Sequence, residues 1–254
     1  ADPLVPVGPP LAGPSAAHPM GTDDLGRDLL SGVVYRIRTS VLVAGSVGLI
    51  VLPLGVGVGA VAGARGGRLD DLLMRLSELW QVLPRFFLAV MVVALFGPGL
   101  DRIVIVLGLT SWALLARVVR SEVLSIRERE YVEAARAVGC GEGRILLRHM
   151  LPHALPAAIV YFALLLAQVI LVEASLGFLG LGDPNAISLG YLAGQAQGFL
   201  RIAWWLWFFP GVALILVVIG LNLGADAIND ALRPGAERHR HWLPGGPVSR
   251  GDGD

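Results

Sequence analysis

The sequence predicts an all-helical integral membrane protein. Hydrophobic residues make up 55% of its 254 residues and charged residues only 16%, and the mean hydropathy is +0.68, far from the balance of a soluble domain. Five stretches approach the roughly 20 apolar residues that a membrane-spanning helix needs. They cover about residues 41–62, 79–96, 103–119, 155–172 and 202–223.

The first 39 residues are polar and rich in proline, and we expect them to form an extracytoplasmic segment. No apolar signal segment of the usual kind precedes them, and the sequence begins with Ala1 rather than Met. We therefore expect an upstream span before this sequence, which would give six spans in total. Residues 40–234 then form the transmembrane domain, and residues 235–254 form a polar cytoplasmic tail.

The first and second spans each carry one informative feature. Gly55, Gly59 and Gly63 are spaced four residues apart in the first span, a pattern that permits close helix contact in lipid, within the chain or between subunits. Arg85 lies inside the second span. The glycine spacing therefore predicts a tightly packed first helix. The charge of Arg85 means that the existence of the second span is predicted but its ends are not.

The arginines set the expected orientation, because cytoplasmic flanks of membrane helices carry the excess of positive charge. The connections after the first and third spans and the tail together hold 14 arginines, whereas the opposite connections hold five. The segment 125–152 is therefore predicted to be cytoplasmic. The net charge is zero, and nothing in the composition indicates a nucleic-acid partner.

Segment 125–152 is predicted to form a helical hairpin. Ser125 and Glu128 have capping-box spacing, and Gly139 is a helix stop, so we expect one helix over about 126–138. A second helix, over about 142–150, is expected to end near Pro152. Taken alone, this pattern fits an amphipathic element on the lipid surface equally well.

The spacing within the hairpin favours a different interpretation. The segment from Glu133 to Pro152 reads Glu-Ala-Ala, three residues, a glycine, nine residues, two further residues and then Leu-Pro. This spacing resembles the signature loop of ATP-binding-cassette (ABC) importer permeases. Isoleucine is frequent where this chain has His149, but Arg-His-x-Leu-Pro is a usual form in the peptide and nickel branch. The matching residues are Glu133, Ala134, Ala135, Gly139, His149, Leu151 and Pro152.

Two further segments resemble the second permease subunit of that branch. One is the extracytoplasmic motif after His18-Pro, and the other is Glu173 to Gly182. In the first, a calcium loop is disfavoured because regular oxygen ligands and a closing glutamate are missing. We expect Thr22 or Asp23 to cap a helix there. The motif residues are Gly21, Thr22, Asp23, Gly26, Arg27 and Asp28.

The resemblance implies a function and a set of partners. It implies a permease of the bacterial cytoplasmic membrane that works by alternating access, with a homologous permease, two ATPase subunits and an extracytoplasmic substrate-binding protein. Its hairpin would sit in a groove of an ATPase subunit. Di- and oligopeptides are the leading cargo, with nickel chelates or small oligosaccharides as alternatives. The chain has no phosphate-binding loop, so ATP and magnesium are expected on the partner ATPases and none of its own residues is catalytic.

Three residues within the spans are candidates for the pathway. Glu173 is costly in a membrane unless it faces water, protein or a partner charge. It could meet a peptide amino group, or it could accept hydrogen bonds from the glycine-rich turn after it, which we favour. Gln168 and Trp112 are weaker candidates, and helix packing explains both equally simply.

Other functional classes find less support. A passive channel or a membrane scaffold would need no coupling hairpin, and a hydrolase would need a convergent catalytic set that the spans lack. His149 and His153 are four residues apart, but Pro152 interrupts the helix between them, so we expect no metal site. The single Cys140 excludes an internal disulfide.

Overall fold

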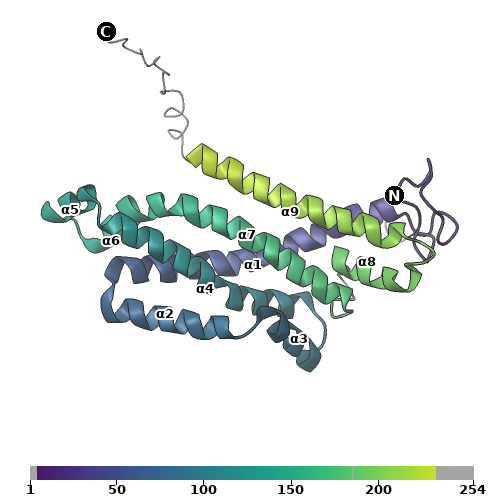
Figure 1. The fold of residues 1–254 in the computed structure, drawn as a ribbon, viewed down its shortest axis with the longest axis horizontal. Helices are drawn as coiled ribbons and strands as arrows, with labels where there is room; N and C mark the ends of the chain where they lie inside the picture. The colour runs from purple at the N-terminus through teal and green to yellow at the C-terminus, as the bar shows by residue number, and fades with distance from the viewer. Residues whose placement is uncertain (1–4, 185, 233–254) are drawn as a thin grey trace, which may run out of the picture.

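The computed structural model describes residues 5–184 and 186–232, which confirm the all-helical prediction (Figure 1). In that part of the chain the only β-structure consists of the isolated bridges Pro6–Arg27 and Thr22–Asp28. The predicted tail 235–254 lies outside the described residues. The α-helices are α1 (Leu29–Arg65), α2 (Gly67–Val82), α3 (Arg85–Phe96), α4 (Leu100–Arg127), α5 (Glu130–Ala137), α6 (Glu142–Ile145), α7 (Leu151–Phe178), α8 (Leu189–Gln195) and α9 (Trp205–Leu232).

Four helical segments are long and apolar enough to cross a membrane: α1, α4, the continuous segment Glu142–Phe178, and α9. Figure 1 shows them running along the long axis of the molecule. The helices α2 and α3 give a fifth span if they are counted together, and they meet at an angle of 66°. Each of the five predicted apolar stretches therefore lies mostly in helix, and four of them match an unbroken helix apart from residues 202–204 before α9.

The second predicted span, 79–96, is wrong as a single helix. It is broken at Leu83 and Pro84, which both adopt extended backbone angles. A proline disfavours helical geometry in the residue before it and lacks the N–H that would continue the helix. The break places Arg85 at the first position of α3 instead of in the interior of a continuous helix.

Three of the unbroken spans begin and end beyond the apolar stretches that predicted them, whereas α9 begins at Trp205, inside its stretch. Helix α1 starts at Leu29, inside the expected extracytoplasmic segment 1–39. Its first turns contain Arg36 and Ser40, whose exposed fractions are 5% and 0%. An apolar stretch in the sequence shows only the lipid-facing part of a helix. Where a helix continues with polar residues that are buried against other helices, its ends cannot be predicted from apolarity.

The glycines of α1 make its contact with α4. A Cβ atom on Gly59 would lie 2.3 Å from the carbonyl oxygen of Ala116, and one on Gly55 would lie 2.8 Å from the Leu115 side chain. At Gly63 the nearest atom is the carbonyl oxygen of Arg120, at 2.9 Å. The close contact predicted from the glycine spacing is confirmed, and within this chain it serves internal packing.

An ion pair between a buried carboxylate and a partly exposed arginine joins α2 to α4. The Asp70 carboxylate, 6% exposed, accepts two hydrogen bonds from the Arg120 guanidinium, one of them 2.6 Å long from Nη2. Removing one partner of such a pair leaves the other without its counter-charge, so Asp70→Asn is expected to lower the unfolding free energy by about 2 kcal/mol. The exposed pair Glu78–Arg117, at 3.5 Å, is the matched control, and Glu78→Gln is expected to cost less than about 0.5 kcal/mol. Thermal unfolding in detergent checks this, and equal losses would contradict it.

Candidate functional site

The predicted hairpin lies at one end of the molecule, opposite the N-terminal segment and α8 (Figure 1). Its first helix is shorter than predicted. Helix α4 continues to Arg127, so Ser125 lies inside it, and α5 begins only at Glu130 with Arg129 as its N-cap. The predicted capping box is therefore wrong, because the span that precedes the hairpin runs through the proposed cap.

The predicted helix stop at Gly139 is confirmed. Gly139 has φ = +82°, its N–H donates to Arg136 O at 2.9 Å, and the Cys140 N–H donates to Ala135 O at 3.1 Å. These two bonds form a Schellman motif, which requires a left-handed residue at this position. An added Cβ would meet no atom within 4 Å, so glycine is needed here for its backbone conformation and not for space.

Helix α5 has two distinct faces. Val132 is fully buried, and Ala135 packs against the same core. Glu133 and Ala134 are exposed, and Val138 at the end of the helix is 79% exposed. Because successive helical residues are about 100° apart, the two alanines of the signature serve different sides. One anchors the hairpin and the other faces outward.

The second arm of the hairpin does not end near Pro152, and that prediction is wrong. The segment from Glu142 to Phe178 is continuous, with a π-helix at Leu146–Met150 in which the Leu151 N–H donates to Leu146 O. Pro152 has no N–H for an α-helical bond, and the chain widens by one residue before it instead of stopping. The hairpin therefore leads directly into a membrane span.

The remaining signature residues lie around this π-helix. The carbonyl oxygen of His149 accepts hydrogen bonds from Tyr131 Oη at 3.4 Å and from His153 Nδ1 at 2.9 Å. Leu151 packs against the hydrophobic core, whereas Pro152 is exposed. The Tyr131 and His153 rings are also in contact, with centroids 5.8 Å apart. His149 thus fixes α5 to the second arm through its backbone.

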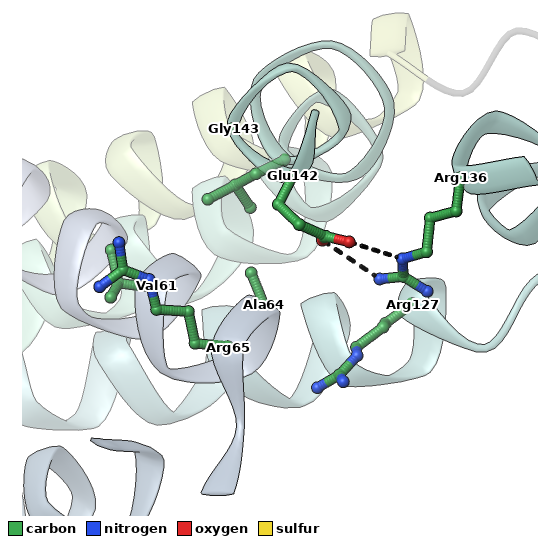
Figure 2. Close-up of a pocket in the computed structure, with 8 residues that line it drawn as sticks. Val61, Ala64, Arg65, Arg127, Arg136, Glu142 and Gly143 are labelled. Atoms are coloured by element: carbon green, nitrogen blue, oxygen red, sulfur yellow. Dashed lines mark hydrogen bonds and ion pairs between the residues drawn. The ribbon is translucent and has the colours of Figure 1, made fainter. Parts of the chain in front are cut away.

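A cavity of about 460 Å³ lies between the hairpin and the ends of α1 and α4 (Figure 2). Arg136 of α5 donates to the Glu142 carboxylate at 2.9 and 3.4 Å, a bidentate bridge that closes the hairpin. Arg65 and Arg127 come from the last turns of α1 and α4, where helix dipoles favour cations. With three arginines and one glutamate, the lining is positive and suits acidic groups. These residues were not predicted to form a site, although basic residues in the final turns of two helices were a usable signal.

The extracytoplasmic motif forms a folded loop before α1. Thr22 is fully buried, accepts a hydrogen bond from the Ala12 N–H and donates one to Pro9 O. The Asp23 carboxylate accepts from the N–H groups of Leu25 and Arg27. The expectation that Thr22 or Asp23 caps a helix is wrong, because both serve the loop itself. Gly21 and Gly26 have φ values of +80° and +74°.

Asp28 is the N-cap of α1, and it sets a pH-dependent contribution. Its carboxylate accepts hydrogen bonds from the Ser31 N–H and hydroxyl at 2.9 and 2.7 Å, and the His18 ring lies 3.2 Å away. Burial raises the pKa of this carboxyl, but the bonds from Ser31 and His18 outweigh burial and lower the pKa below its ordinary 3.8. A lowered pKa stabilises the fold above pH 3.8 and loses this effect as the pH falls further.

We expect Asp28→Ala to lower the free energy of opening the loop by about 1 kcal/mol at neutral pH, because the first turn of α1 loses its cap. The exposed Asp24→Ala is the matched control and is expected to change little. The rate of limited proteolysis within residues 5–28 measures this. Equal protection of both variants at pH 7 would contradict the cap.

The structure does not gather the three pathway candidates into one site. Glu173 is 1% exposed, and its Oε2 accepts a hydrogen bond from Ser40 of α1 at 3.5 Å. Trp112 is 6% exposed and belongs to the hydrophobic core. Gln168 is exposed and lines a cavity together with Arg85 and Ser111.

The chain is similar to membrane components of known transport systems. A family model described as "Binding-protein-dependent transport system inner membrane component" matches residues 55–238. The chain is 38% identical over 225 residues to the "Dipeptide transport system permease protein DppC" of Alkalihalophilus pseudofirmus, covering 88% of this chain and 74% of that protein. It is also 38% identical to the "Di/tripeptide transport system permease protein DppC" of Pseudomonas aeruginosa, with the same coverage. Inward-facing structures of the MetNI methionine ABC transporter share its fold, with a TM-score of 0.63 at 22% identity over 80% of this chain and 95% of that chain.

Proposed function

Because the chain belongs to the family of binding-protein-dependent transport system inner membrane components and is thus a permease component of an ABC importer, we propose that it carries di- or oligopeptides. In this proposal it forms the pathway together with a homologous permease. Two ATPase subunits bind ATP and magnesium, and an extracytoplasmic protein delivers the cargo. The pathway opens alternately to either side of the bacterial cytoplasmic membrane.

The observation that supports the proposed coupling role is a hairpin that is anchored on its inner side and exposed on its outer side. Helix α5 is held from within by Val132, closed by the Schellman motif at Gly139, and bridged to α6 by Arg136–Glu142. Its outer face presents Ala134 and the exposed apolar Val138. A small residue beside an exposed apolar one at the end of a fixed helix is suited to a groove of a partner protein. We propose that an ATPase subunit supplies this groove.

Peptides are the proposed cargo because the relatives named for dipeptide and di/tripeptide transport align with most of this chain. Nickel chelates and small oligosaccharides are the alternatives within the same class of importer. A passive channel or a scaffold is the alternative of a different class, and the buried anchoring of the hairpin counts against it. A hairpin without a partner would need neither its inner anchor nor its exposed apolar residue.

The test is reconstitution of the importer from this chain, its partner permease, the ATPases and the binding protein in liposomes. We expect uptake of a labelled dipeptide that requires both ATP and the binding protein. Nickel chelates and a small oligosaccharide serve as competing cargos in the same vesicles. Peptide uptake that persists without ATP would support a channel, and no peptide uptake alongside uptake of another cargo would overturn the peptide assignment.

A further inference from the structure

A second cavity, of about 360 Å³, lies where the break between α2 and α3 faces α4 and α7. Three polar side chains line it, Arg85 from α3, Ser111 from α4 and Gln168 from α7. Its remaining wall is apolar and includes Phe86, Leu107 and Val169. A mostly apolar cavity with a few converging polar groups is the usual form of a small-molecule site.

The cavity lies deep within the helices. Ser111 is roughly 16 Å along α4 from Leu100, and Gln168 is roughly 15 Å along α7 from Phe178, at about 1.5 Å per residue. These helix ends lie at one level, because the Leu100 N–H donates to the Asp183 carboxylate just after α7, at 3.2 Å. Counted from helix ends at the edge of a hydrocarbon layer about 30 Å thick, both residues fall near the middle of that layer.

Arg85 brings an uncompensated charge to this depth. Its Nη1 donates to Ser111 Oγ at 3.4 Å, near the outer limit for a hydrogen bond, and a guanidinium has five N–H donors. Among the described residues that line the cavity none is acidic. The first turn of α3 has no side-chain cap, so its dipole adds a charge of the same sign. Ionisable groups inside membranes face water or protein instead of lipid, so we expect Arg85 to face one of these at the cavity.

We propose that Arg85, with Ser111 and Gln168, binds the C-terminal carboxylate of the peptide as it passes through the membrane. This proposal rests on the proposed peptide function. A guanidinium pairs with a carboxylate through two parallel hydrogen bonds, the Gln168 amide is a further donor, and the apolar wall accommodates the last side chain of the peptide. Arg85 can exchange its long hydrogen bond to Ser111 for bonds to the carboxylate, and can form the bond to Ser111 again after the peptide leaves. Arg85 is thereby a specificity residue of the pathway.

The test compares Arg85→Gln, Arg85→Lys and wild type in the fully assembled importer in liposomes. Uptake of Ala-Phe and of its C-terminal amide is measured at concentrations that load the binding protein equally. We expect Arg85→Gln to lower uptake of the free acid by about tenfold or more, which matches the loss of a charged hydrogen bond, and to change uptake of the amide less than about twofold. Arg85→Lys is expected to recover only part of the uptake of the free acid, because lysine keeps the charge but not the two parallel donors. Arg38→Gln, at an exposed arginine of α1, is the matched control.

The outcomes separate the alternatives. Equal loss for both peptides would overturn the proposal, because it would assign Arg85 to packing or to an acidic side chain of the partner permease. Unchanged uptake of the free acid by Arg85→Gln would overturn it as well. If the wild-type importer takes up neither peptide, the proposed peptide function itself fails. If Arg85→Gln loses the preference for the free acid over the amide, with an unchanged yield of assembled complex, the result would support the proposed role of Arg85.

Discussion

Replacing Val138 with aspartate is expected to detach the ATPase subunits from the membrane subunit while the membrane domain stays folded. Val138 is 79% exposed at the end of α5, and no buried contact depends on it. A charge placed in an apolar contact with a partner costs both the contact and the desolvation of the carboxylate. We expect the binding free energy to fall by at least about 2 kcal/mol, or roughly a thirtyfold loss of affinity, if Val138 contacts the ATPase as proposed.

Co-purification of the ATPases with the assembled complex from detergent measures this effect. Val7→Asp is the control, because Val7 is also exposed and apolar but lies in the segment at the opposite end of the molecule. We expect Val7→Asp to retain the ATPases and Val138→Asp to lose them. If both variants retain the ATPases equally, the outer face of α5 is not the docking surface. Unaltered thermal unfolding of Val138→Asp ensures that a loss reflects docking.

Gly59→Val is expected to have the largest effect on folding. Its Cβ would lie 2.3 Å from the carbonyl oxygen of Ala116, a backbone atom that can move only if α1 and α4 separate. This contact is the closest of the three that the glycines of α1 make with α4. We expect a loss of about 3 kcal/mol or more in unfolding free energy, at the upper end of the range for overpacked interiors.

Gly57→Val is the matched control for Gly59→Val. Gly57 lies in the same turn of α1 but is exposed, and an added Cβ meets no atom within 4 Å. Valine changes the helix propensity equally at both positions, so the difference between the variants reports the contact with α4. Thermal unfolding and the yield of folded protein in detergent measure it. Similar unfolding temperatures and yields for the two variants would show that α1 and α4 can separate at Gly59 without loss of stability.

The sequence predicted the fold well wherever one physical effect dominates. Long apolar stretches predicted the spans, and the spacing of Gly55, Gly59 and Gly63 predicted a close helix contact, because lipid leaves small residues few other uses. Gly139 was correctly predicted to end α5, since its left-handed conformation is a local requirement of the chain. These features depend on composition or on neighbouring residues alone.

The errors arose where tertiary contacts or competing local rules decide. Ser125 fits a helix cap, but packing carries α4 past it. Pro152 fits a helix end, but a π-helix accommodates it within a longer helix. The cavity under the hairpin escaped prediction because Arg65, Arg127 and Glu142 are far apart in the sequence and meet only through folding. Asp28 caps α1 instead of Thr22 or Asp23, because the side chains of Thr22 and Asp23 form hydrogen bonds within the loop.

The continuity of the helix from Glu142 to Phe178 has a mechanical consequence for the proposed importer. With 37 residues at about 1.5 Å each, it is a rod of roughly 55 Å that reaches from the hairpin to the glycine-rich turn at the opposite end. A push on the hairpin would travel along this continuous helix, through the π-helix and Pro152, as a displacement of the whole helix. The far end fits closely against α8, since a Cβ on Gly190 would lie 2.1 Å from Ala174 O, so both ends would move in the same stroke.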